Sequence, residues 1–433
     1  MHPDREIRQY FHVERVKRMD ITQSRQREGN RNLPELLSPA GDLDRVHTAL
    51  LYGADAVYLA GRLFGMRAKS VSFQDADLEQ AIRLIHDQGK KAYIACNVLP
   101  REKELTLVPD YFSFLQELGA DALILADLGL LHMAERYAPK CARHVSTQLG
   151  VLNSETASFL YDLGADTVVL ARECGMEEIR EIREHCPAEL RLEAFVHGAM
   201  CVSFSGRCLL SNYLTGRDAN HGECAQPCRW KYHLVEETRP GQYLEISESE
   251  GTYILNSEDL CMIEHLADLR EAGIDSFKIE GRMKSAYYTG AITNAYRMAL
   301  DALGRGETLP LGAVRECDAV SHRPYCTGFY YGRPQQYTTD SLYRSTAEIM
   351  AVVAACGDDG TALLQQRNKI VPGDRLELLL PGTDGIPFIA ETIRDENGEL
   401  LSDTRHAEML FRMQLPAYAP PHTIVRTARI SYD

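Results

Sequence analysis

The 433-residue sequence lacks any apolar run long enough to cross a membrane. Runs such as ALILADLGLL stop well short of the about 18–20 residues that a spanning helix needs. The first twenty residues, MHPDREIRQYFHVERVKRMD, also lack the uninterrupted apolar core of a signal peptide. We therefore expect a cytoplasmic protein, whose twelve cysteines are thiols or metal ligands rather than a disulfide framework.

Positive charge is not in excess, because 47 Lys and Arg residues face 62 Asp and Glu residues and the net charge is −15. This balance argues against a general polyanion binder. Basic residues do gather locally, at Arg207, Arg217, Arg229 and Lys231, and again in KIEGRMK (278–284). Such clusters are most often a solvated surface, so they do not by themselves establish RNA binding.

Several catalytic motifs are absent as well. The sequence contains neither HExxH nor GxSxG, which removes the usual signatures of zinc peptidases and serine hydrolases. No GxGxxG follows the first apolar run, so an open dinucleotide-binding sheet is the less favoured fold. A cysteine nucleophile paired with His197 stays open on the residues alone.

What the sequence does contain is a regular alternation of apolar runs and amphipathic stretches from Leu33 onward. Glycine-containing joints (YGAD, LGAD, LGAD and AGID) stand between a helical pattern and the next run, as expected where a helix ends and a strand begins. Eight β/α units over about 270 residues predict an α/β fold, a TIM-type (β/α)8 barrel over residues 33–305. The eight predicted strands lie in ELLSPAG, AVYLAG, AYIACN, ALILAD, HVSTQ, TVVLAR, LEAFVHG and SFKIEG.

Four further segments are predicted, one of them an insertion within the barrel. Residues 1–32 are polar and predict a loose tail. An insertion over about 198–262 follows the seventh strand, and only its end, NSEDLCMIEHLADLREAG, has a helical pattern. Residues 306–340 form a linking segment, and residues 341–433, with Asp-Gly and Asn-Gly turns between short apolar runs, predict a small β-barrel domain.

Four cysteines lie in the insertion with the spacing C-x6-C-x15-C-x3-C: Cys201, Cys208, Cys224 and Cys228. Four thiolates from one loop suit either tetrahedral zinc or an iron–sulfur cluster, and spacing alone does not decide between them. Cys261, at the start of the predicted helix, is a competing fourth ligand. Because loops after barrel strands form the catalytic face, we expect this metal site to be functional rather than structural.

Polar residues stand at the ends of the predicted strands, where they would line one pocket. His197 could carry a proton near neutral pH, or could equally be a hydrogen-bonded structural histidine. The cations suit a ligand that bears carboxylates. The candidates are Asn97, Gln148, Arg172, Glu173, Glu193, His197, Lys278, Glu280 and Arg282.

The motif EAFVHGAMCVSFSGRCLLS (193–211) resembles the signature of the U32 family, historically called collagenase-like peptidases. SPAGD, NSEDLC, FKIEGRMKS and SHRPYCTGFYYG are similar to the same family, so that the resemblance covers residues 33–433. SNYLTGRDANHGECAQPCRWKY most resembles the branch of prephenate-dependent hydroxylases that convert the wobble uridine of tRNA to 5-hydroxyuridine. Related branches hydroxylate ribosomal RNA or act in ubiquinone synthesis.

The resemblance implies a [4Fe–4S] cluster on Cys201, Cys208, Cys224 and Cys228, with Cys261 replacing Cys228 in some branches. It also implies oxygen-independent hydroxylation with prephenate as the oxygen donor, and an assembly with itself or with a related family member. We expect Glu193, His197 and Glu280 to be catalytic. Prephenate would contact Arg172, Lys278, Arg282, Asn97 and Gln148, and tRNA would contact Arg207, Arg217 and Arg229. The alternatives are a peptidase, a hydroxylase of another RNA or of a small molecule, and an RNA-binding scaffold with structural zinc.

Overall fold

The computed structural model describes residues 33–66, 72–201, 203–204, 207–221, 223–230, 234–235, 243–244, 257–334, 337 and 342–429. The predicted polar tail (1–32) and much of the predicted insertion lie outside these residues. Residues from Pro34 onward form one unit, distinct from the residues before it. Among the described residues, no helix is both long enough and apolar enough to span a bilayer.

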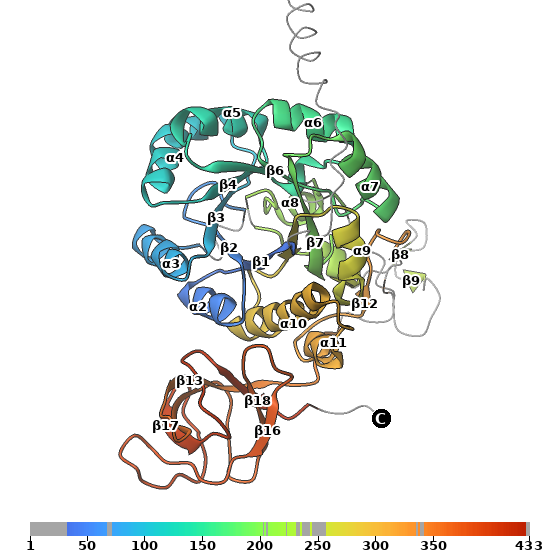
Figure 1. Ribbon diagram of the computed structural model, residues 1–433. Coiled ribbons are helices and arrows are strands. Elements are labelled where there is room, and N and C mark those ends of the chain that lie inside the picture. The colour runs from blue at the N-terminus through green and yellow to red at the C-terminus, as the bar shows by residue number, and fades with distance from the viewer. Residues whose placement is uncertain are drawn as a thin grey trace, which may run out of the picture. The chain divides into compact units, whose positions relative to one another are not determined.

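Eight parallel strands close into a barrel, and they are the eight predicted from the apolar runs. Neighbouring strands pair in chain order, and β11 closes the ring by pairing with both β1 and β7. The ring and its surrounding helices are visible in Figure 1. The strands are β1 (Glu35–Pro39), β2 (Ala56–Leu59), β3 (Lys91–Cys96), β4 (Ala122–Leu125), β5 (Ala142–Val145), β6 (Thr167–Val169), β7 (Arg191–Ala199) and β11 (Ser276–Ile279).

Helices cover the outside of this barrel, and their apolar faces form the main core with the outward side chains of the strands. Side chains cap several of them, as when Asp42 accepts a hydrogen bond from the Arg45 amide (2.9 Å). The predicted joints are confirmed, because their glycines have φ of 89–94°, a conformation that glycine adopts without strain. The helices are α2 (Leu43–Leu51), α3 (Asp75–Asp87), α4 (Val108–Glu117), α5 (Leu128–Tyr137), α6 (Ser154–Asp162), α7 (Met176–His185), α9 (Leu266–Glu271) and α10 (Ala286–Arg305).

The insertion after β7 returns to the barrel as a strand, where the sequence predicted a helix. β10 (Asp259–Cys261) runs antiparallel to β7, with Asp259 opposite Ala199 and Cys261 opposite His197. The helical prediction for NSEDLC was therefore wrong, and the helix α9 begins only at Leu266. Pairing with β7 and a buried ion pair between Asp259 and Arg323 (2.6 Å) outweigh the local helical pattern.

The segment predicted to link the two domains also extends the barrel sheet. It forms α11 (Leu311–Asp318) and β12 (Tyr325–Cys326), and β12 pairs in parallel with β10. Tyr330 donates a hydrogen bond from its hydroxyl to the Phe195 carbonyl of β7 (2.6 Å). Residues far along the chain therefore stand beside the end of the seventh strand.

The C-terminal residues form a curled antiparallel sheet with its own apolar core, as the turn chemistry predicts. The segment AETIRDENGELL, which contains the Asn-Gly turn, forms no strand, and its Arg394 makes isolated bridges to Leu400 and Arg412. The strands are β13 (Ile349–Cys356), β14 (Thr361–Gln366), β15 (Arg375–Leu379), β16 (Ile386–Ile389), β17 (Leu410–Gln414) and β18 (Ile424–Thr427).

Buried polar contacts join this sheet to the barrel. The Tyr52 hydroxyl of α2 donates to the Leu379 carbonyl (2.7 Å) and accepts from the Ile424 amide (3.1 Å). The Arg426 guanidinium of β18 donates to both carboxylate oxygens of Glu316 on α11 (2.7 and 2.6 Å). Both side chains of that pair are fully buried.

Candidate metal centre at the barrel mouth

The four predicted cysteine ligands lie in the part of the insertion that the structure describes. Cys201 and Cys224 are exposed, and Cys208 and Cys228 are half-buried. Burial raises the pKa of the Cys228 thiol, and the neighbouring thiols of Cys201, Cys224 and Cys208 raise it further. The assignment of these four cysteines to one metal centre stays a prediction from their spacing in the sequence.

Local hydrogen bonds shape the loops that carry these cysteines. The Ser211 hydroxyl of α8 (Leu210–Thr215) accepts a bond from the Ala225 amide (2.9 Å), which joins the stretch after Cys208 to the one around Cys224. Pro227 starts a short 3-10 turn, Pro227–Arg229, that contains Cys228. Asn220 bonds to both the amide (3.2 Å) and the carbonyl (3.3 Å) of Leu99, in the loop after β3. The insertion is thereby anchored over the mouth of the barrel.

Cys261 lies in a second cluster, with His197 and Cys317. The potential ligand atoms of these three residues are all within 4.8 Å of one another. A thiol hydrogen bond from Cys317 and the neighbouring His197 hold the pKa of Cys261 well below its usual range, and the same contact raises the pKa of Cys317. The role of Cys261 as an alternative cluster ligand stays a prediction.

Several of the predicted pocket residues gather around two aromatic rings. Lys278 forms a buried ion pair with Glu193 (2.6 Å), and its ammonium lies 4.8 Å from the ring of Tyr58. The Tyr58 hydroxyl is 3.2 Å from a carboxylate oxygen of Glu280. The Phe195 ring lies near both cations, with its centroid 5.6 Å from the Lys278 ammonium and 4.1 Å from the Arg172 guanidinium carbon. Glu193, Lys278, Glu280 and Arg172 therefore belong to one site.

Gly198 allows β7 to approach this group closely. Its φ is +116°, and a Cβ atom there would stand 2.5 Å from the Glu280 carbonyl oxygen. Only a residue without a side chain fits both conditions.

One N–H group of the Arg172 guanidinium has no hydrogen-bond acceptor among the described residues. One of its terminal nitrogens donates to the Ala199 carbonyl (2.8 Å), but its buried Nε has no hydrogen-bond partner there. Burial also raises the pKa of the neighbouring Glu173 carboxyl. An unsatisfied guanidinium N–H at the mouth of a barrel is a suitable contact for an anionic ligand.

The other predicted pocket residues form hydrogen bonds within the protein or are buried. Asn97 accepts a hydrogen bond from the Met66 amide (3.0 Å), and Gln148 accepts one from the Ser146 hydroxyl (3.2 Å). Arg282 is buried. His197 is only 1% exposed and is enclosed by tyrosines, which does not suit a proton carrier that must meet the substrate directly.

The described part of the insertion carries exposed aromatic and basic side chains. Tyr213 is 86% exposed and Trp230 is 42% exposed, and the guanidinium-bearing residues Arg207 and Arg217 are exposed nearby in the chain. Arg229 is half-buried and donates a hydrogen bond to Gln226. Large exposed aromatic residues on one short segment are unusual for a surface that contacts only water.

Sequence reasoning missed the contribution of the segment after α10. Cys317, Arg323 and Tyr325 all lie beside β7 or β10, although they were assigned to a linking segment. The one available signal was the composition of SHRPYCTGFYYG, which is richer in aromatic residues and cysteine than a simple linker needs.

A family model matches this arrangement over most of the chain. The model described as peptidase family U32 matches residues 41–340, and that of the peptidase family U32 C-terminal domain matches residues 345–426. The chain belongs to peptidase family U32. The predicted resemblance is therefore confirmed.

Curated U32 relatives carry different names. The chain is 33% identical over 403 residues to "tRNA hydroxylation protein P1" of Bacillus subtilis, a match that covers 92% of this chain and 95% of the relative. It is 38% identical over 269 residues to "23S rRNA 5-hydroxycytidine C2501 synthase" of Escherichia coli, covering 62% and 39%. It is 32% identical over 313 residues to "Collagenase" of Porphyromonas gingivalis, covering 69% and 74%.

Proposed function

We propose that this U32 protein is an enzyme that hydroxylates RNA, and specifically that it converts the wobble uridine of tRNA to 5-hydroxyuridine. The observation that carries the proposal is the match to a tRNA hydroxylation protein over nearly the full length of both chains. A second relative is named as the synthase of a hydroxylated ribosomal nucleoside. In this proposal the reaction takes its oxygen from prephenate rather than from molecular oxygen.

The donor set at the insertion fits a [4Fe–4S] cluster. None of the four cysteines of the insertion is a buried core residue, and cysteine thiolates are the ligands that such clusters require. Cys201, Cys208, Cys224 and Cys228 would hold the cluster. When bound, it would supply one-electron chemistry at the barrel mouth.

We propose that the residues around Tyr58 and Phe195 bind a small dicarboxylate. The Arg172 guanidinium has a buried N–H without a partner among the described residues, and both this guanidinium (4.1 Å) and the buried Lys278 ammonium (5.6 Å) lie near the Phe195 ring. Because Glu193 pairs with Lys278 at 2.6 Å and offsets its charge, Arg172 is the cation that we assign to a ligand carboxylate. Prephenate carries two carboxylates, and we propose that one of them binds Arg172.

The outer face of the insertion fits a single-stranded loop of RNA. Exposed aromatic rings can stack on bases that leave the helical stack, and neighbouring guanidinium groups can contact phosphates. Tyr213 and Trp230 supply the rings, and Arg207 and Arg217 supply the positive charge. This local charge would offset the acidic balance of the whole chain. A uridine base would reach the pocket by flipping out of its loop.

The function is tested by nucleoside mass spectrometry of bulk tRNA from cells with and without the gene. We expect 5-hydroxyuridine and its derivatives to disappear on deletion and to return when the wild-type gene is restored. Purified protein that cleaves denatured collagen, combined with an unchanged nucleoside profile, would instead identify a peptidase like the relative named as a collagenase.

Replacing Arg172 with lysine should raise the KM for prephenate by about 10-fold or more, since a charge-assisted hydrogen bond contributes about 1.5–3 kcal/mol. Lysine keeps the charge but loses the Nε donor and the planar contact with Phe195. The affinity for tRNA should not change. Arg180→Lys, on the exposed surface of α7, is the matched control and should leave the KM unaltered.

Tyr213→Ala and Trp230→Ala should each weaken tRNA binding by about 10-fold, within the 1–3 kcal/mol that stacking on one base contributes. Filter binding or fluorescence anisotropy with an anticodon stem-loop measures the change. Phe159→Ala removes a comparably exposed ring (56%) from α6 on the outside of the barrel and serves as the control. Equal affinities in all three variants would remove this face from the tRNA-binding surface.

A further inference from the structure

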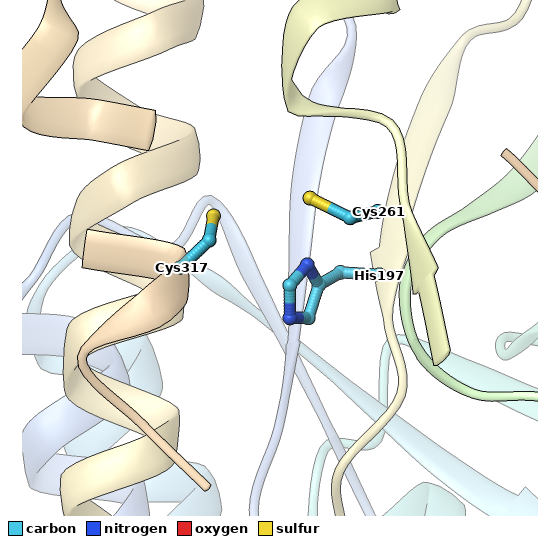
Figure 2. Close-up of side chains that lie close together, drawn as sticks. All are labelled: His197, Cys261 and Cys317. Atoms are coloured by element: carbon cyan, nitrogen blue, oxygen red, sulfur yellow. The ribbon is translucent and has the colours of Figure 1, made fainter. Parts of the chain in front are cut away.

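We propose that His197, Cys261 and Cys317 form a second metal site, which binds one zinc ion. The site is separate from the four cysteines of the insertion and from the residues around Tyr58 and Phe195. Figure 2 shows His197 and Cys261 projecting from adjacent strands toward Cys317 on the facing helix. Three segments distant in sequence, β7, β10 and α11, thus bring one imidazole and two thiols together.

The geometry of the three side chains is close to that of a tetrahedral site. Their potential ligand atoms are all within 4.8 Å of one another. Zinc bonds of about 2.3 Å to sulfur and about 2.0–2.1 Å to nitrogen place neighbouring ligand atoms about 3.5–3.8 Å apart. Shifts of about 1 Å, which side-chain rotations provide, are therefore enough to bring the three atoms onto one ion.

Hydrogen bonds around His197 leave a ring nitrogen available. The Tyr296 hydroxyl lies 3.3 Å from Nδ1, but it donates its own proton to the Val196 carbonyl (2.7 Å). The Tyr325 hydroxyl lies 3.5 Å from Nε2, but it donates to the Cys317 carbonyl (2.7 Å). Neither tyrosine can also donate to the imidazole, so a neutral His197 keeps a lone pair for a ligand. The same contacts orient the ring, as outer partners do in histidine–metal sites.

The buried ligand set, which contains two thiols, favours a metal that binds sulfur strongly. His197 is 1% exposed and Cys317 is 2% exposed, and Cys261 is half-buried between them. Two cysteines and one histidine are a ligand set that zinc binds, with a water molecule in the fourth position. Binding of Zn²⁺ releases the two thiol protons, and the resulting pair of thiolates neutralises the ion. The bound zinc would fasten β10 and α11 to the end of β7.

The test is a metal analysis of the full-length protein purified without oxygen. We expect about one zinc per chain, in addition to the four irons of a [4Fe–4S] cluster on the insertion. Cys317→Ser and Cys261→Ser should lose the zinc and keep the iron, whereas Cys208→Ala should lose the iron and keep the zinc. Cys186→Ser, which alters a buried cysteine after α7, is the matched control and should keep both.

Cobalt substitution gives a second reading of the same site. Wild-type protein stripped of zinc and loaded with Co²⁺ should show thiolate-to-cobalt charge-transfer absorption that Cys317→Ser lacks, because cobalt takes the place of zinc on the same ligands. Wild-type protein without zinc and without this absorption would overturn the proposal. So would loss of iron in Cys261→Ser with the zinc retained, or a Cys261–Cys317 disulfide in non-reduced protein. None of these outcomes depends on which RNA the enzyme modifies.

Discussion

Cys208→Ala is expected to abolish formation of 5-hydroxyuridine and to remove most of the protein-bound iron. Cys208 is half-buried and is one of the four proposed cluster ligands, so its removal would leave three thiolates where a [4Fe–4S] cluster takes four. Loss of an outer partner of a metal site already costs roughly 10–100-fold in affinity or activity, and loss of a ligand should cost more. The measurements are iron content, visible absorption and the tRNA nucleoside profile.

The control for this variant is Cys356→Ala. Cys356 is also half-buried, but it lies in β13 of the C-terminal sheet, and its removal should leave iron and hydroxylation at wild-type levels. If Cys208→Ala kept its colour and its activity, the four cysteines of the insertion would not be the cluster site. The folded state of both variants should be compared by circular dichroism, so that a loss of iron is not confused with unfolding.

Arg426→Leu should lower the free energy of unfolding by about 3 kcal/mol, the lower end of the range for breaking a buried ion pair. The substitution leaves the fully buried Glu316 carboxylate without its two shortest hydrogen bonds, and it also removes the contact to Glu377 (2.9 Å). Arg429, which is 3.3 Å from Glu316, compensates for part of the loss. Urea denaturation followed by circular dichroism measures the change.

A surface pair provides the comparison for this effect. Arg367 lies 3.5 Å from Glu408 and is 28% exposed, so Arg367→Leu should cost about 1 kcal/mol or less. The double variant Arg426→Leu, Glu316→Leu should recover part of the stability, because it removes the uncompensated charge as well as its partner. An unfolding midpoint unchanged in Arg426→Leu would show that this network does not stabilise the contact between the sheet and the barrel.

The barrel could be predicted from the sequence because its signals are local. A parallel strand buried on both faces is an apolar run, and a helix that turns straight into such a strand needs a glycine with positive φ, as at Gly119 and Gly164. The short strands β10 and β12 have no such signal, since two or three residues carry no detectable alternation. Their conformation depends on partners far away in the chain, and NSEDLC consequently looked helical.

The same distinction applies to the candidate sites. The four cysteines of the insertion could be grouped from sequence because they share one segment of about thirty residues. The cluster of His197, Cys261 and Cys317 could not, because closure of the barrel and the return of α11 bring its members together. Nor could the pairing of Lys278 with Glu193, two residues predicted to have separate roles, be seen before the register of β11 on β7 was known.

The insertion leaves the barrel and rejoins it at the same place on β7. The architecture of the barrel therefore does not depend on the residues of the insertion between these two points. The chain leaves β7 at Ala199 and is paired with that same residue again at Asp259. To the barrel, the intervening residues are therefore equivalent to the loop of a hairpin, and their number does not alter the closure of the eight strands. A change in the number or identity of the intervening residues can therefore leave the pairing of β10 with β7, and the register of the eight strands, unaltered.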